Sequence, residues 1–473
     1  MAKTAFRQFL CLIFLLGCTQ TQAVRLSLDS AGQVLLFPLF ITGDSFQTIF
    51  EVRNQTDQGK ALRFVVKDAV NGRPTLSLNV YLSPRDSWSG ALFDPSGASV
   101  ATAESVLAPC ADQSCTFPAR ADIPDEGIAL SDEQFTEDLS DLLVSRSRLG
   151  TGYVEIYEMG TITAALAGDC AEISARWTNG GAWDLDPGQD IEAPGGGLEG
   201  YAVLVQVDNG RAHQYEAIAL ADFRDDSLHT NPFSSRQPNL ADVSPAESRV
   251  VETVVFGNRT LQVERVSTWS EFPVHAVDAL LMATEARADF TAAQELDALV
   301  FATLNFPTRP YHADDQTFFL PEGQERVLAP FAVSLPVGTD ESLDQNRLTV
   351  SSIDREGAAF DLQPFPGQTN CDLANGAVST VFLSRTIGFT EPCPYTTGIF
   401  RVPDNASEGE VRYQLTGEIV SDEGHVFSGL PIAGFVIQSI RNEQIDIRPG
   451  TVGVADYGWA RALKIERQVS DPP

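Results

Sequence analysis

The sequence predicts a mainly β protein made of two β-sandwich domains, immunoglobulin-like or related, with a few short helices. Short hydrophobic runs in which hydrophobic and polar residues alternate recur along the chain. Turn residues separate these runs at short intervals, and helical patterns are few. At 473 residues the chain is too long for one ordinary core, so two domains are expected.

The clearest strand signals lie between residues 33 and 93. Leu62, Phe64 and Val66 fall on one face of a strand, whereas Arg63 and Lys67 fall on the other. This alternation predicts an antiparallel sheet with one buried side and one polar, solvent-facing side.

Asn71 and Gly72 follow this strand and are typical of a two-residue hairpin turn, because both tolerate positive φ angles. We expect the hairpin to be structural and remote from any functional site.

The rest of the first half continues in the same style. Residues 94–125 are polar and small, which predicts a long loop across the sheet, and a capping pattern at Ser131 predicts a helix. Further elements are expected as a strand at 152–160, a short helix at 170–177, and a hairpin of 201–207 and 213–220.

The segment 225–248 is rich in polar and turn residues and has no hydrophobic period, which is typical of a domain boundary. We therefore expect a first sandwich over 24–224, a linker over 225–248 and a second sandwich over 249–473. One helix is expected near 275–286. Strands are expected at 249–256, 260–266, 298–306, 348–353, 379–386, 398–402, 410–419 and 432–440.

The first 23 residues predict an export signal: a basic start, a short apolar stretch and a small-residue cleavage site before Val24. An alternative is a lipoprotein signal, in which Cys18 of Leu-Leu-Gly-Cys becomes the lipidated first residue. No later stretch is a transmembrane candidate. The mature protein is expected in the periplasm, at the outer membrane surface or outside the cell.

Cysteine usage is consistent with export. Cys371 and Cys393 are isolated from the other cysteines and are expected to form one disulfide. For the second disulfide, pairing of Cys115 with Cys170 is favoured because it closes the longer loop. Pairing of Cys110 with Cys115 is the alternative.

The net charge of −32 becomes −34 if Lys3 and Arg7 leave with the signal. So acidic a chain is unsuited to nucleic acids and anionic lipid surfaces.

No catalytic constellation stands out, so we expect no enzymatic activity. The five histidines show no metal-binding spacing, and each is expected at the surface or in a turn. Residues 195–197 are three glycines before a strand, which predicts a flexible turn without phosphate binding.

No cofactor is expected, with calcium as the one possibility. Asp184, Asp186 and Asp190 place carboxylates around a glycine turn, although residue 195 is glycine where an EF-hand needs glutamate.

Trp177 and Trp183 lie shortly before this turn in the sequence. If exposed, they would form an aromatic platform for a sugar ring. The alternative is that they cap a sandwich core.

The chain resembles a family of exported, β-rich envelope proteins of Gram-negative bacteria whose activity is not characterised. The resemblance spans most of the mature chain and lies in GQVLLFP at Gly32, VRNQTDQGKALRFVVKDAVNGR at Val52, LNVYLSPRDSWSGAL at Leu78, GYVEIYEMG at Gly152, NFPTRPY at Asn305 and GLPIAGFVIQS at Gly429. It implies export and a β-rich fold, but no activity. It also implies that Cys115 pairs with Cys170 and that Cys110 is an addition.

These observations predict a non-catalytic envelope or extracellular protein with a structural, adhesive or assembly role, whose partners are other surface proteins or glycans. The alternative is an extracytoplasmic carbohydrate-binding protein or a hydrolase acting on glycans, since β-sandwiches host both classes.

Overall fold

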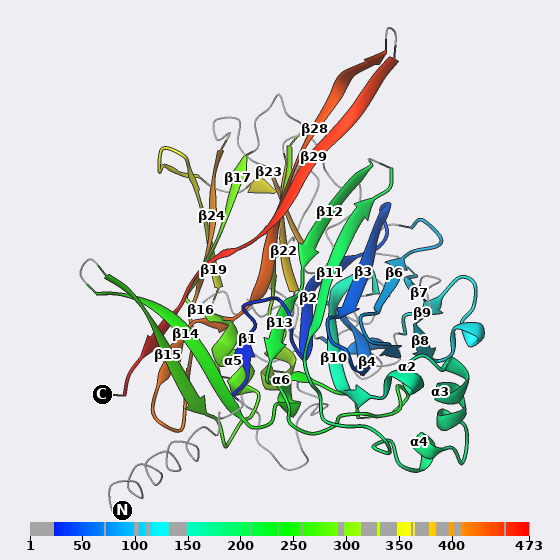
Figure 1. Ribbon diagram of the computed structural model, residues 1–473. Helices are drawn as coiled ribbons and strands as arrows, with labels where there is room; N and C mark the ends of the chain where they lie inside the picture. The colour runs from blue at the N-terminus through cyan, green and yellow to red at the C-terminus, as the bar shows by residue number, and fades with distance from the viewer. Residues whose placement is uncertain are drawn as a thin grey trace, which may run out of the picture.

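The computed structural model describes residues 23–472 except 71, 99–103, 110–113, 132–148, 209, 235, 257–258, 292–297, 314–328, 332–347, 361–362, 365–377, 385–396, 402–407 and 449–450. The chain is mainly β, as predicted, with several antiparallel sheets and short helices (Figure 1). Several predictions fall outside the described residues: positions 1–22 of the predicted signal at 1–23, including Cys18, the helix from Ser131, and Cys110, Cys371 and Cys393.

Two facing sheets form the first sandwich. One has the strand order β1 (Arg25–Leu26), β13 (Ile218–Ala221), β2 (Val34–Ile41), β10 (Thr151–Ile162), β4 (Gly59–Asp68), β5 (Pro74–Leu82) and β8 (Cys115–Phe117). The other has β12 (Arg211–Glu216), β11 (Leu198–Gln206), β3 (Phe46–Asn54), β6 (Ser87–Phe93), β7 (Val106–Pro109) and β9 (Ile128–Ala129). The expectation of a long loop over 94–125 is wrong in part, because the segment contains β7, which pairs with β6 and β9, and β8, which pairs with β5.

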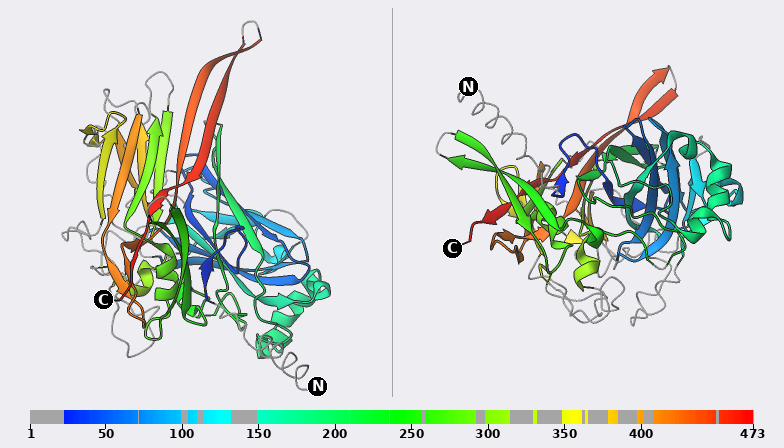
Figure 2. Two further views of the ribbon diagram at one scale, coloured as in Figure 1. Left: turned by 60° about the vertical axis from the view of Figure 1, so that its left-hand side comes forward. Right: turned by 60° about the horizontal axis from the view of Figure 1, so that its bottom comes forward.

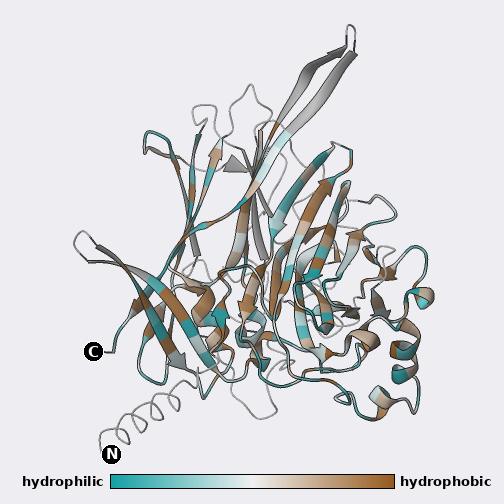
Figure 3. Cartoon of the chain, viewed as in Figure 1, coloured by the Kyte–Doolittle hydropathy of each residue, from teal (hydrophilic) through white to brown (hydrophobic). Residues whose placement is uncertain are grey.

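Two more sheets form the second sandwich. One has the order β20 (Ala359–Phe360), β19 (Leu348–Asp354), β24 (Glu408–Leu415), β17 (Glu285–Thr291) and β30 (Lys464–Glu466). The other has β21 (Gln363–Pro364), β23 (Thr397–Arg401), β22 (Val378–Ser384), β18 (Ala298–Asn305), β28 (Ala433–Arg448) and β29 (Thr451–Ala462). Figure 3 shows hydrophobic residues concentrated on strands in the body of the molecule.

Smaller elements cover the ends of the sandwiches. The small sheets are β14 (Glu247–Phe256) with β15 (Arg259–Thr268), β16 (Met282–Ala283) with β27 (Leu430–Pro431), and β25 (Glu418–Val420) with β26 (Val426–Ser428) and β31 (Gln468–Ser470). The helices are α2 (Ala164–Ala167), α3 (Cys170–Trp177), α4 (Ala182–Leu185), α5 (His275–Leu281) and α6 (Arg309–Ala313), with 3₁₀ turns η2 (Arg120–Asp122) and η5 (Leu240–Asp242). The helix expected to reach residue 286 ends at Leu281, and the strand expected at 410–419 is broken into β24 and β25.

The alternation along β4 has the predicted register but a different environment. Leu62, Phe64 and Val66 point into the core of the first sandwich. Arg63 and Lys67 on the other face are also buried, at 0% and 1% exposure. The expectation of a solvent-facing polar side is therefore wrong, because later segments of the chain cover it.

The hairpin of β4 and β5 is confirmed, but its turn is wider than two residues. The Asp68 amide donates to the Arg73 carbonyl oxygen at 3.0 Å, so four residues lie between the paired positions. Gly72 has a φ of +70°, and a Cβ built there would lie 2.4 Å from Pro310 of the second half. The turn therefore packs against the second half of the molecule.

Residues 225–248 pack on the outer face of the first sandwich. Arg63 donates to the carbonyl oxygen of Thr230 at 2.7 Å, and Leu240 and Val243 are buried in a hydrophobic cluster that also contains Tyr157. This segment, expected as a linker, is therefore a folded covering layer.

Residues 300–305 of β18 and 435–439 of β28 are buried on both faces. Val300 and Val436 contribute to the core of the second sandwich, whereas Phe301, Phe435 and Ile437 contribute to the core of the first. Phe435 stacks on Tyr215 of β12, with ring centroids 4.1 Å apart. The two halves consequently share one hydrophobic layer.

Candidate functional site

Strands β28 and β29 form a long antiparallel ribbon that projects beyond both sandwiches (Figures 1 and 2). Below the ribbon, the chain continues into β30 and then β31, so the last residues join three sheets in succession. The ribbon is thus an extension of the second sandwich whose base is fixed to the body. The strand predicted at 432–440 forms the first part of β28, whereas β29 was not predicted.

Two large aromatic side chains are exposed where the ribbon leaves the body. Tyr457 is 57% exposed and Trp459 is 44% exposed. Their positions differ by two residues along β29, so they lie on one face of the strand. Exposed aromatics so close together form a surface that can contact a partner.

The opposite face of β29 holds this aromatic pair in place. Ala460 packs against the core of the first sandwich. A Cβ built at Gly458 would lie 2.1 Å from Cε1 of His213 on β12, so only glycine permits this close approach.

The strands β14 and β15 form a second ribbon, on the other side of the molecule in Figure 1. Val251, Leu261 and Val266 on it are 47%, 50% and 39% exposed. These aliphatic residues bury less area than aromatics, so this ribbon is the weaker candidate for an interaction surface.

The aspartates proposed for calcium each have another interaction. Asp184 and Asp186 accept hydrogen bonds from turn amides at 2.8 Å and 3.0 Å, and Asp190 forms an ion pair with Arg176 at 2.9 Å. Within the described ranges, they are not among the acidic, histidine or cysteine groups whose ligand atoms lie within 4.8 Å of one another. Calcium binding at this turn stays a prediction.

Trp177 and Trp183 are 5% and 0% exposed, which excludes them as an open sugar platform. They pack with Tyr81 and His229, and the Cys115–Cys170 disulfide, confirmed here, attaches α3 to β8 beside them. The reading that they cap a core is the correct one.

His229 is neutral inside this aromatic cluster. Its Nδ1 lies 2.5 Å from the Pro187 carbonyl oxygen, which only accepts, so Nδ1 carries the proton and Nε2 accepts from the Tyr81 hydroxyl at 3.0 Å. Burial lowers the pKa of His229 to about 4.

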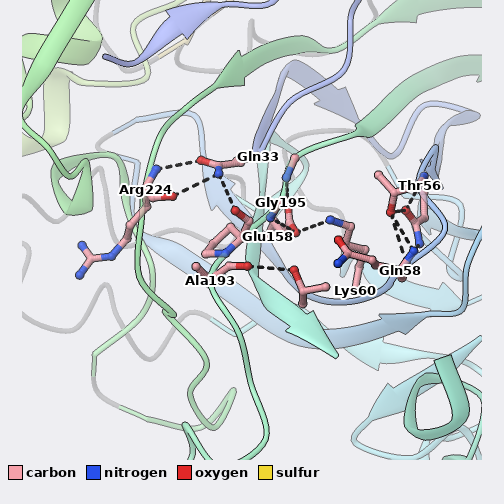
Figure 4. A network of polar contacts seen from close by, with 12 residues as sticks. Gln33, Thr56, Gln58, Lys60, Glu158, Ala193, Gly195 and Arg224 are labelled. Atoms are coloured by element: carbon pink, nitrogen blue, oxygen red, sulfur yellow. Dashed lines mark hydrogen bonds and ion pairs between the residues drawn. The ribbon is translucent and has the colours of Figure 1, made fainter. Parts of the chain in front are cut away.

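The glycine run at 195–197 is anchored by Glu158 and is not a free flexible turn (Figure 4). The amides of Gly195 and Gly196 donate to the two Glu158 oxygens at 2.8 Å and 2.7 Å. Lys60 Nζ lies 2.6 Å from Glu158 Oε1, and both side chains are fully buried. Burial raises the pKa of the Glu158 carboxyl, although Lys60 and the amides act in the opposite direction.

A polar hollow of 170 Å³ opens at the segment 227–230 and is also lined by Arg224, Arg236 and Asp242. Arg224 pairs with Asp226, and Arg236 pairs with Asp242 at 3.2 Å. The cations of this hollow are therefore neutralised by neighbouring carboxylates, which makes it a weak candidate for an anion site.

None of the described helices is both long and apolar enough to cross a membrane.

Comparison with known proteins assigns no family. No family model matches the chain, and no curated protein matches it. A solved structure of Pleurotus ostreatus lectin in its apo form aligns over 94% of this chain and 88% of the lectin, with 9% identity and a TM-score of 0.13. A score this low carries no argument about fold or ligand. The resemblance to exported envelope proteins therefore stays a prediction.

Proposed function

We propose that the chain is an exported, non-catalytic protein of the cell envelope or extracellular space that binds other surface proteins in an adhesive or assembly role. The observation that carries the proposal is the exposed pair Tyr457 and Trp459 on a ribbon that projects beyond both sandwiches. Aromatic residues supply much of the binding energy of protein interfaces. The Cys115–Cys170 disulfide supports export, since such bonds persist in oxidising compartments.

The test compares two double variants for binding to intact envelope preparations from the native host. Tyr457→Ala with Trp459→Ala removes the aromatic pair, and Leu28→Ala with Leu185→Ala removes two side chains that are 93% and 76% exposed elsewhere. We expect the first variant to lose at least about tenfold in affinity and the control to bind normally. Equal binding by both variants would contradict the proposal.

The partner class is tested in the same assay. Binding that disappears after protease treatment of the envelopes supports a protein partner. Binding that survives protease, but disappears after glycosidase treatment and reappears on a glycan array, would replace the proposal by the carbohydrate-binding alternative.

Export is tested by intact-mass measurement on the protein from its native host. We expect a chain that begins at Val24 or at lipidated Cys18. Retention of residues 1–23 would contradict export.

A further inference from the structure

We propose that His275, Asp278 and His312 form a binding site for one divalent transition-metal ion, with zinc as the ion to test. Their ligand atoms lie within 4.8 Å of one another. His312 Nε2 lies 2.8 Å from Asp278 Oδ2, and His275 Nε2 lies 4.0 Å from the same oxygen. Ligands about 2 Å from one zinc ion lie about 3 to 4 Å apart, so small side-chain adjustments suffice.

Two helices from different parts of the second half bring these residues together. His275 and Asp278 are three residues apart on α5 and therefore share a face, and His312 lies on α6 after β18. The rings of His275 and His312 stack with centroids 5.2 Å apart. The expectation that these histidines occupy the surface or turns is wrong, because they are 8% and 1% exposed.

Two of the three side chains in the cluster have poorly satisfied polar atoms, whereas His275 Nε2 lies 3.4 Å from the Ala329 carbonyl oxygen. Neither oxygen of Asp278 and neither ring nitrogen of His312 forms an aligned hydrogen bond to a described residue, although both side chains are fully buried. The 2.8 Å distance between His312 Nε2 and Asp278 Oδ2 is thus short enough for a hydrogen bond, but the angle is unsuitable for one. A buried carboxylate is costly without a counter-charge, and a metal ion supplies one.

Apolar groups enclose the cluster. Trp269 and Phe272 lie edge-on to His275 at 5.6 Å and 5.5 Å, and Phe331 lies 5.8 Å from His312.

The ion would join α5 to α6, two helices of the second half that both pack against the first half. Val277 and Leu280 of α5 belong to the cluster that contains β2 and segment 240–243, and Tyr311 of α6 contacts Lys67 on β4. A bond from α5 to α6 through one ion therefore stabilises the junction, which gives the site a structural role.

The experiment uses the full mature chain with a histidine-free affinity tag, stripped with EDTA and titrated with zinc chloride. We expect about one zinc per chain after gel filtration and a higher midpoint of thermal unfolding, because the ion binds the folded state. His312→Ala and Asp278→Asn should each lower zinc affinity at least tenfold. His425→Ala is the matched control, since this histidine lies outside the cluster and should leave affinity unchanged.

Cobalt substitution of the wild-type chain gives a second readout that does not depend on the folding of a variant. Nitrogen and oxygen ligands give weak visible bands, whereas thiolate ligands give an intense near-ultraviolet band. The absence of stoichiometric zinc, unchanged affinity in a folded His312→Ala variant, or a thiolate spectrum would each overturn the proposal.

Discussion

Lys67 and Glu155 form an ion pair in the interior, with Nζ 2.6 Å from Oε2 and both side chains shielded from water. They lie on neighbouring strands β4 and β10, and the Tyr311 hydroxyl of the second half lies 2.8 Å from Lys67 Nζ. Burial lowers the pKa of Lys67, but Glu155 and Tyr311 outweigh it, so the net pKa is raised. Lys67 therefore stays charged at neutral pH, and its contact with Tyr311 links the two halves.

Removing one partner of this pair should destabilise the chain strongly. We expect Lys67→Met to lower the free energy of unfolding by about 3 to 5 kcal/mol, because Glu155 is left buried without its counter-charge. Lys67→Met with Glu155→Leu should recover much of this loss. Urea denaturation measures both variants. Arg85→Met, which breaks the exposed Arg85–Asp57 pair, is the control and should change stability little; a similar loss there would contradict the argument.

The Gly72 turn gives a second prediction. Gly72→Ala adds a Cβ that would lie 2.4 Å from Pro310 and 2.5 Å from the Tyr153 hydroxyl, at a positive φ. Gly97 has nearly the same φ, +69°, but nothing within 4 Å of its added Cβ. We expect Gly97→Ala to cost about 1 to 2 kcal/mol from backbone strain alone and Gly72→Ala to cost clearly more. Equal midpoints in thermal melts would show that the turn does not pack on the second half.

The disulfide gives a third prediction. Replacing Cys115 and Cys170 together by serine should cost about 4 kcal/mol by the chain-entropy estimate for their separation of 55 residues. Because α3 then loses its covalent attachment, Trp177 and Trp183 should gain exposure, and tryptophan emission should shift to the red. Unchanged stability and emission would exclude a role for this bond. Peptide mapping without reductant tests the predicted Cys371–Cys393 bond at the same time.

The low pKa of His229 predicts a pH dependence. Between its ordinary value of 6.5 and about 4, the unfolded chain binds a proton at this residue but the folded chain does not. Stability should therefore fall as the pH falls through this window, by about 3 kcal/mol from His229 alone. His229→Gln cannot titrate there, so its stability should depend less on pH than that of the wild type. Urea denaturation of both proteins at pH 7 and at pH 4.5 measures this difference. An equal loss of unfolding free energy between the two pH values in both proteins would contradict the prediction.

Local patterns in the sequence were sufficient for most strands. Leu62, Phe64 and Val66 alternate with polar residues because one face of β4 packs into a core, and this signal needs no knowledge of the rest of the chain. The helix at 170–177 was equally local. The short strands β7 and β8 were missed because they have only four and three residues, too few to show a clear alternation.

The environment of the polar face could not be predicted in the same way. Alternation shows that Arg63 and Lys67 differ from their neighbours, but not whether water or protein covers them. Thr230 and Tyr311 cover them, and both come from segments far along the chain. The proximity of His275 and His312 could not be predicted for the same reason, because no spacing in the sequence indicates that α5 and α6 are in contact.

The stacking of Phe435 on Tyr215 affects how the chain is made. During synthesis the first sandwich is complete in sequence long before Phe301, Phe435 and Ile437 emerge to cover its apolar face. At 5 to 20 residues per second, roughly 10 to 40 s pass between the synthesis of Tyr215 and that of Phe435. A nascent chain with such an apolar face exposed is prone to aggregation until Phe435 and Ile437 have been synthesised.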